Sequence, residues 1–181
     1  MKGINLTVNV KPHIQKYIIQ TVGSDTIRLE RSRTLTYIIL PHLSLVPADE
    51  ADDETPEDYV PIHIELPCHS LTYEAATGRV YNCFPLYRDK ITPEGQEKVR
   101  RFLGNTFKQS FRMFMDGYIA DQIDMLSISD KERRLRVQEG IISFLLSYGI
   151  EPEELLVSSL RRDWYRHCDR TQKNRFSPLL Y

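Results

Sequence analysis

Between positions 99 and 118, apolar residues recur every three or four positions, and this run restricts the fold more than any other part of the chain. Such spacing places side chains on one face of an α-helix. Thr92-Pro93-Glu94, just upstream, is a helix-start signal, because threonine caps free N–H groups and proline fits the first turn. We predict a long central helix whose apolar stripe is Val99, Phe102, Leu103, Thr106, Phe107, Phe111, Phe114 and Tyr118.

The residues before this helix follow a different period. Ile4 to Val10 alternate between apolar and polar residues, which predicts a strand with one buried face. Val60 to Leu66 alternate in the same way, with Pro61 at an edge or among the first residues of its strand. Thr26 to Leu29 are predicted to form a further short strand.

Two segments of the first half are read from helical spacing and length. Pro12 fits a first helical turn, and apolar residues follow at helical spacing until Gly23, which predicts a short amphipathic helix. Leu35 to Leu40 is an apolar run too short to assign by period, so helix and strand both stay open for it.

A hairpin and an acidic segment complete the first half. Leu71–Glu74 and Val80–Phe84 are predicted to pair, since Gly78 between them can supply the positive φ of a short loop. Residues 49–58 contain seven carboxylates and no basic residue. Such a run cannot supply a buried face, so residues 48–59 are predicted to be a mobile acidic loop.

Two further helices are predicted after the central one. Ser129-Asp130-Lys131-Glu132 fits a capping box, and apolar residues follow at helical spacing until Gly149. The last helix is expected to begin between Pro152 and Ser159 and to end near Arg170.

These elements predict an α+β fold. The N-terminal half would hold a small antiparallel sheet with one or two helices, and the C-terminal half three helices ending in a helix-turn-helix-like pair. At 181 residues the chain can bury about 70% of the surface of its unfolded form, as one domain does. We predict a single domain, 1–181, with a strand-rich half (1–91) and a helical half (92–181).

Composition points to a globular cytoplasmic protein. The apolar fraction of 41% and charged fraction of 27% are close to globular averages. No stretch approaches the roughly 18 consecutive apolar residues of a membrane span, and the first residues lack the apolar core of a secretory signal. Three widely spaced cysteines without a C-x-x-C pair make a disulfide framework improbable.

The last helix carries two opposed stripes. Val157, Leu160, Trp164 and Cys168 form the apolar one, and a basic stripe follows two positions later, about 200° around the helix. If the apolar face packs on the core, the cations face outward, in a geometry suited to tracking phosphates. The basic stripe is Arg162, Arg166, Arg170 and Lys173, with Arg161 near its boundary.

Further cations crowd the start of the preceding helix, where the helix dipole disfavours positive charge. Arg133, Arg134 and Arg136 are the candidates for contact with a nucleic-acid backbone, beside Lys131. Glu132 and Asp130 partly offset their charge, so a solvated, salt-bridged helix face explains the same residues.

Residues 141–160 are compatible with a helix-turn-helix that has Gly149 in the turn. Leu145 stands where such a motif usually has a small residue, and Ser158 where it has an apolar one. A plain helical hairpin explains the same pattern, and both interpretations stay open.

Two short segments resemble a loose set of uncharacterised proteins from prophages and mobile elements of gut bacteria. They are Val10-Lys11-Pro12-His13-Ile14-Gln15-Lys16-Tyr17-Ile18 and Ser159-Leu160-Arg161-Arg162-Asp163-Trp164-Tyr165-Arg166. The resemblance covers the ends and the central helix. It implies a regulatory protein and favours DNA binding without identifying a site.

No enzyme, metal or cofactor signature is present in the sequence. Glycine-rich phosphate loops, G-x-S-x-G and H-E-x-x-H are absent, and the acidic run lacks the pattern of a calcium loop. His63, Cys68, His69 and Cys83 have no standard zinc spacing, so packed cysteines and ordinary histidines are the better account. His167 and Cys168 point about 100° apart on a helix and do not make a base and nucleophile.

The resulting hypothesis is a small non-enzymatic DNA-binding accessory or regulatory protein. Its last two helices would contact a duplex, Trp164 would anchor the last helix, and the sheet half would support a homodimer or a protein partner. The alternative is a protein-interaction or structural module without nucleic acid, which the net charge of −1 favours.

Overall fold

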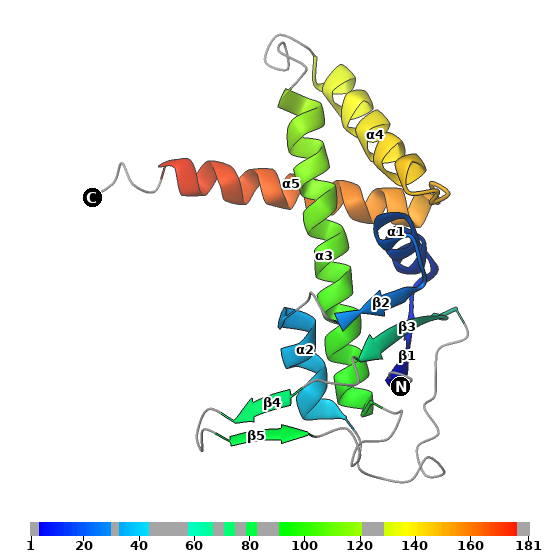
Figure 1. The fold of residues 1–181 in the computed structure, drawn as a ribbon. Helices are drawn as coiled ribbons and strands as arrows, with labels where there is room; N and C mark the ends of the chain where they lie inside the picture. The colour runs from blue at the N-terminus through cyan, green and yellow to red at the C-terminus, as the bar shows by residue number, and fades with distance from the viewer. Residues whose placement is uncertain are drawn as a thin grey trace. The chain divides into compact units, whose positions relative to one another are not determined.

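The computed structural model describes residues 4–29, 33–43, 58–66, 71–74, 79–82, 91–120 and 129–176. The fold is α+β, as predicted, with two short helices beside a three-stranded sheet in the first half and three helices in the second. In chain order (Figure 1) the elements are β1 (Ile4–Val10), α1 (Pro12–Val22), β2 (Thr26–Arg28), α2 (Arg33–Ile39), the 3-10 helix η2 (Leu40–His42), β3 (Val60–Leu66), β4 (Leu71–Glu74), β5 (Arg79–Asn82), α3 (Pro93–Ala120), α4 (Asp130–Ser147) and α5 (Glu154–Phe176).

The chain divides into two compact units, Met1–Gly104 and Asn105–Tyr181, with the boundary inside α3. The single-domain organisation with halves 1–91 and 92–181 stays a prediction. Among the described residues, no helix is long and apolar enough to cross a membrane.

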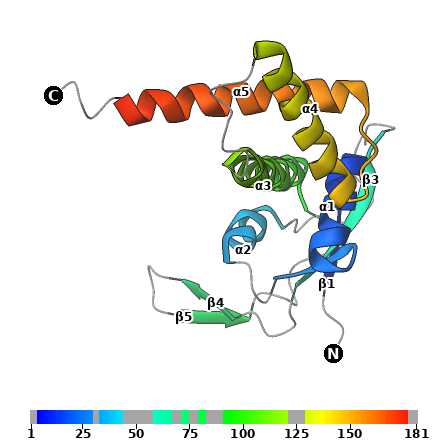
Figure 2. The same cartoon turned by 90° about the horizontal axis from the view of Figure 1, so that it is seen from above.

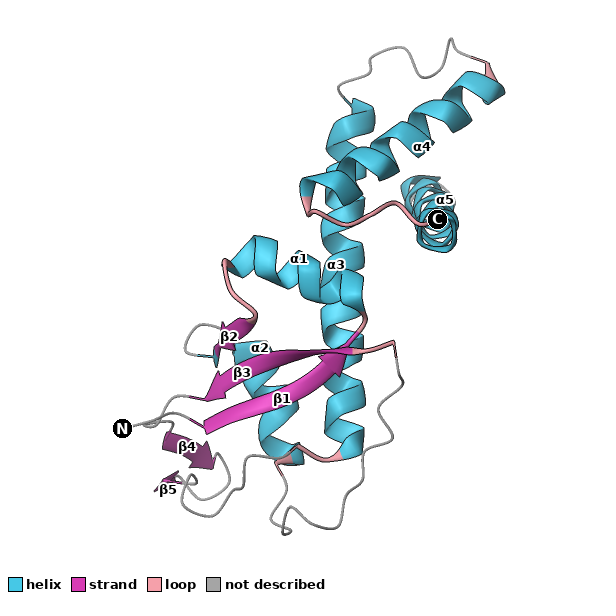
Figure 3. Ribbon diagram, turned by 90° about the vertical axis from the view of Figure 1, so that its right-hand side faces the viewer, coloured by secondary structure: helices cyan, strands magenta, loops and turns pink. Residues whose placement is uncertain are grey.

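The sheet of the first unit has the strand order β1-β3-β2 (Figure 3). β1 pairs antiparallel with β3, placing Leu6 opposite Ile64, while β2 runs parallel to β3. The sheet is therefore mixed, and the prediction of a wholly antiparallel sheet was wrong for β2. Parallel neighbours need a long crossover, and the chain from β2 to β3 supplies one that contains α2.

Alternation along β1 and β3 gives the sheet one buried face. Leu6, Val8, Ile62 and Ile64 are fully buried, and Figure 3 shows α2 and the first turns of α3 on one side of the sheet. Pro61 lies in the first residues of β3, outside the part that β2 pairs with, so no ladder bond to β2 is lost.

The remaining predictions for the first unit have clear outcomes. α1 begins at Pro12, and Gly23 follows it with φ 80°, as the sequence predicts. The run left open is a helix, because Leu35 and Ile39, one turn apart, are both buried. β4 and β5 form the predicted hairpin, whereas Gly78 and residues 48–57 of the acidic loop lie outside the described residues.

The predicted central helix is α3, and its first turn is capped as expected. Thr92 Oγ1 accepts a hydrogen bond from Gly95 N at 3.2 Å. A turn later, Arg100 Nε donates to the carbonyl of Asn9 at 2.7 Å and its guanidinium lies over the ring of Tyr59. Arg100 therefore ties the start of α3 to the last residues of β1.

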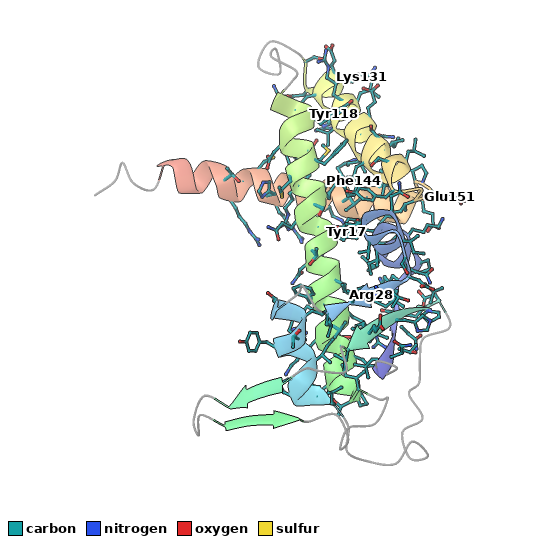
Figure 4. The ribbon with its side chains drawn as sticks, viewed as in Figure 1. Tyr17, Arg28, Tyr118, Lys131, Phe144 and Glu151 are labelled. Carbon is teal, nitrogen blue, oxygen red and sulfur yellow. The ribbon has the colours of Figure 1, made fainter. Side chains whose placement is uncertain are left out.

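The second unit is built around Phe144 of α4, whose side chain is fully buried. Its ring centroid lies 5.5 Å from that of Phe107, 5.3 Å from that of Phe111 and 5.0 Å from that of Tyr148. Figure 4 labels Phe144 on the side of α4 that faces α3. Offset and tilted rings at these distances attract each other beyond the gain from burial, so this cluster holds α4 on α3.

Gly140 is a point of close approach between α4 and side chains of α3. A Cβ atom placed there would lie 2.9 Å from Cδ1 of Tyr118 and 3.0 Å from Sδ of Met115. Met115 is fully buried, so its side chain is enclosed by neighbouring residues. The glycine therefore sets the spacing of the two helices.

α4 begins and ends at the signals read from the sequence. Ser129 Oγ accepts from the backbone N–H of Glu132 at 3.3 Å, and Gly149 has φ 63°. The N–H of Ile150 returns to the carbonyl of Leu145 at 2.9 Å, which closes the helix end. Residues 148–153 join α4 to α5 (Figure 2), and α5 ends at Phe176, beyond the predicted Arg170, since Thr171–Arg175 contain no glycine or proline.

We expect Gly140→Ala to lower the free energy of unfolding by about 1–3 kcal/mol, because the added methyl overpacks a filled core. Gly117→Ala in α3 is the matched control, since a Cβ there meets no atom within 4 Å. It should raise that free energy by about 0.5–1 kcal/mol through helix propensity. Urea denaturation of both variants checks the pair, and equal stabilisation by both would contradict the close approach at Gly140.

His13 makes the first unit sensitive to acid. Burial, aided by the charge of Lys11, lowers its pKa from 6.5 to about 4. A histidine whose folded pKa is depressed stabilises the fold above its unfolded pKa, and this stability is lost as the pH falls from 6.5 towards 4. Thermal unfolding of His13→Gln should therefore show a smaller loss of Tm over that interval than the natural chain. A parallel loss in both would show that His13 does not contribute.

Candidate functional site

The apolar stripe predicted for α5 is buried in the second unit. Val157, Leu160 and Trp164 are between 3% and 8% exposed, so this face of the helix packs on the core. Cys168, the fourth residue of the stripe, is half-buried. Trp164 holds α5 in place, as predicted, and its ring lies beside that of His167 with centroids 5.6 Å apart.

The opposite face of α5 carries Arg162, Arg166 and Arg170, which we call the arginine ridge. All three side chains are exposed, and none makes a hydrogen bond or ion pair with another residue in the described part of the chain. Successive members lie about 6 Å apart along the helix axis, from a rise of 1.5 Å per residue. Lys173 continues the ridge in sequence, but its side chain lies outside the described residues.

One flank of α5 faces α3, and there an arginine of α3 binds Asp163, an acidic residue next to the ridge. Asp163 accepts two hydrogen bonds from Arg112, at 2.8 Å from Nε and 2.7 Å from Nη2. These bonds raise the pKa of the Arg112 guanidinium and keep it charged. Asp163 is therefore neutralised by a partner 51 positions away and does not cancel the charge of the ridge.

The other flank of α5 faces α4. Arg161 Nη2 donates to Oε1 of Gln138 at 2.9 Å. Arg161 Nε is buried and, within the described residues, has no hydrogen-bond partner. Tyr165, one turn further on, is 39% exposed. This flank thus combines a cation held in place with an accessible aromatic ring.

The structure separates the cations predicted at the start of α4 into two groups. Arg133 lies 3.3 Å from Oδ1 of Asp130, and Arg136 lies 3.4 Å from Oε1 of Glu132. These two belong to the salt-bridged face that the alternative interpretation expected. Arg134 is exposed and has no such partner in the described part, and the same holds for Lys131, which the site prediction left out.

The first turns of α4 and the middle of α5 border a groove of about 860 Å³. It brings Arg133, Arg134 and Arg161 of the predicted set together, but Arg162, Arg166 and Arg170 lie outside it. The residues that matter for its chemistry are Lys131, Arg134, Leu135, Gln138, Arg161 and Tyr165. Sequence reasoning missed Leu135, Gln138 and Tyr165, although an aromatic residue between Arg162 and Arg166 was a signal.

Acidic residues surround the start of α5. Glu151 and Glu153 are exposed and lie within three positions of Glu154, the first residue of the helix. In a helix-turn-helix protein the N-terminal turns of the second helix contact base edges. Three carboxylates there disfavour that docking mode, so the cations available to an anionic ligand lie further along α5.

Two other constellations supply no activated group. Burial, followed by the charges of Asp116 and Asp169, raises the pKa of the Cys168 thiol, so the protonated form dominates near neutral pH. His167 Nε2 lies 3.4 Å from Oδ2 of Asp116. His63 lies against Thr7. Cys68, His69 and Cys83 fall outside the described residues, so the structure does not test the zinc alternative.

Comparison with known proteins adds no family. The chain matches no family model, no curated protein and no solved structure.

The Arg112–Asp163 pair offers a direct test of how α5 is held. We expect Asp163→Ala to lower the free energy of unfolding by about 1–2 kcal/mol, because a half-buried bidentate pair is lost. Arg112→Ala should cost about the same, and the double variant less than the sum of both, since contacting residues couple. Chemical denaturation of the four proteins measures this coupling, and strictly additive losses would contradict a functional ion pair.

Proposed function

We propose that this protein is a small, non-enzymatic, nucleic-acid-binding accessory or regulatory protein whose arginine ridge contacts double-stranded DNA. One observation carries the proposal. Three guanidinium groups project from one face of a helix whose opposite face is buried, and all three lack partners in the described residues. A row of cations without partners in the described residues, on a helix held in place by its buried face, can bind a row of anions.

The chemistry of the ridge fits phosphate groups. A guanidinium presents a planar fork of N–H donors that bonds phosphate oxygens in pairs. Duplex DNA carries one negative charge per about 1.7 Å of axis. When a duplex lies along the ridge, every arginine of the ridge is therefore close to a phosphate. Because Trp164 anchors the helix, little conformational entropy is lost from the backbone when DNA binds.

The acidic start of α5 places the contact in the middle and later turns of the helix. Glu151 and Glu153 would meet the phosphates if the helix entered a groove by its first turn. Lys131 and Arg134 add charge from α4, whereas Arg133 and Arg136 add less because they already pair with carboxylates. The proposal therefore needs no helix-turn-helix docking mode.

A protein-interaction module is the second candidate, and one observation favours it. Leu135 and Leu146 of α4 are 57% and 60% exposed, and 11 residues, about three turns, put them on the same face. Exposed leucines on one face of a helix are available for contact with another chain. Under this alternative the natural chain would assemble or capture a partner without any dependence on the ridge.

The setting of the proposed function follows from the sequence. A DNA-binding role is compatible with the cytoplasm of a bacterial cell, and the resemblance to prophage and mobile-element proteins favours such an origin. The cytoplasmic location and the mobile-element origin are both proposals, and both depend on the DNA-binding assignment.

We expect the purified chain to bind a labelled random duplex in fluorescence anisotropy, with affinity falling along a log–log salt slope of about −3 to −5. That slope corresponds to the ridge together with Lys131 and Arg134. Reversing two charges in Arg162→Glu/Arg166→Glu should remove most of the binding and reduce the magnitude of the slope by about 2.

The matched control reverses two exposed cations of α3, in Arg101→Glu/Lys108→Glu, which also have no partner in the described residues. It changes the net charge equally and should keep most of the affinity. If both double variants lost the same amount of affinity for DNA, binding would depend on the net charge of the protein alone, and the ridge would not be the binding site. No binding at low salt would reject the function itself, and sedimentation would then test the protein-interaction candidate.

A further inference from the structure

The groove between α4 and α5 combines apolar and charged side chains, whereas the arginine ridge is made of cations alone. Two apolar surfaces are accessible in it, since Leu135 is 57% and Tyr165 is 39% exposed. Its volume of about 860 Å³ lies in the range of sites that hold small organic groups. The groove can therefore receive a flat, apolar part of a ligand and not only its charges.

The border of the groove is positive. The two carboxylates of the described residues that line it, Asp130 and Glu132, are engaged by Arg133 and Arg136. Lys131 and Arg134 remain exposed and without partners in the described part of the chain. A ligand of the groove should accordingly join an apolar ring to nearby negative charge.

Arg161 supplies a further donor in the groove. Its Nη2 is held by Gln138, while Nε is buried with no acceptor in the described residues. A buried donor without an acceptor is unfavourable, so an acceptor that enters the groove relieves that cost after a small movement of the guanidinium. This is the one buried side-chain nitrogen or oxygen of the described part that lacks a partner.

We propose that the groove binds an unpaired base of a nucleic acid together with its neighbouring phosphates. Tyr165 stacks on the base, Leu135 covers its edge, and Lys131 and Arg134 bind the phosphates. An aromatic ring beside cations is the arrangement by which proteins hold single strands, whereas the bases of a duplex are already stacked on each other. The proposal rests on the proposed function and narrows its substrate to DNA that carries both paired and unpaired segments.

The groove and the ridge are adjacent on the same helix. Arg162 follows Arg161 and Arg166 follows Tyr165, so these two ridge residues each lie about 100° around α5 from a groove residue. A duplex along the ridge can thus continue as a single strand into the groove. The expected ligand is a duplex end with an overhang.

The experiment compares three labelled ligands by fluorescence anisotropy with the full chain. They are a blunt duplex, the same duplex with a short oligothymidine overhang, and the same duplex with an abasic overhang of equal length. We expect the thymidine overhang to raise affinity about fivefold or more over the abasic one, which carries the same phosphates but no base to stack.

Variants of Tyr165 locate this gain. Tyr165→Phe keeps the ring and should retain the full effect, whereas Tyr165→Ala should abolish it while leaving the affinity for the blunt duplex unchanged. Circular dichroism of both variants checks that they are folded. Equal affinity for the thymidine and abasic overhangs would overturn the stacking role, and so would a gain that survives Tyr165→Ala.

The outcomes separate this inference from the proposed function. Binding of the blunt duplex that depends on Arg162 and Arg166, without any gain from the overhang, would overturn the groove alone. A gain from the overhang in the natural chain, together with an affinity for the blunt duplex that Arg162→Glu/Arg166→Glu leaves unchanged, would support the groove and reject the ridge. Failure to bind any of the three ligands would overturn both.

Discussion

The candidate site depends on the packing of Phe144 against α3. Its ring contacts those of Phe107, Phe111 and Tyr148, while Gly140 one turn earlier allows the two helix backbones to approach. This packing decides which face of α4 is buried and which is turned to solvent. The accessible cations of α4 and the groove beside α5 are consequences of that choice, since a rotated α4 would bury them.

Pairing of carboxylates is the second condition for a basic surface in a chain of net charge −1. Asp163 is bound by Arg112, and Asp130 and Glu132 are bound by arginines of their own helix. Each pair removes one negative charge from the neighbourhood of the ridge or the groove. Local pairing therefore matters more for binding an anion than the total charge. Salt in the solvent screens the interaction between exposed charges that are more than about 8–10 Å apart.

Local signals predicted the elements whose boundaries they mark. Pro12 and Gly23 delimit α1, Ser129 and Gly149 delimit α4, and alternation defines β1. Prediction was weaker where no local signal exists. The parallel pairing of β2 was missed because it depends on a crossover, and the end of α5 was misplaced because no residue near Arg170 stops a helix.

The sequence by itself determined the α+β class, the opposed faces of α5 and the excess of cations near the end of the chain, because each follows from spacing along one element. Only the tertiary structure decided which cations are free. The pairs of Arg133 and Arg136 within α4 settle an alternative that the sequence had left open, whereas Arg161 meets Gln138 of another helix and Asp163 meets Arg112 across 51 positions. These contacts are between side chains of different turns or different helices, and helical periodicity describes only the direction of a side chain, not the partner that packing brings to it.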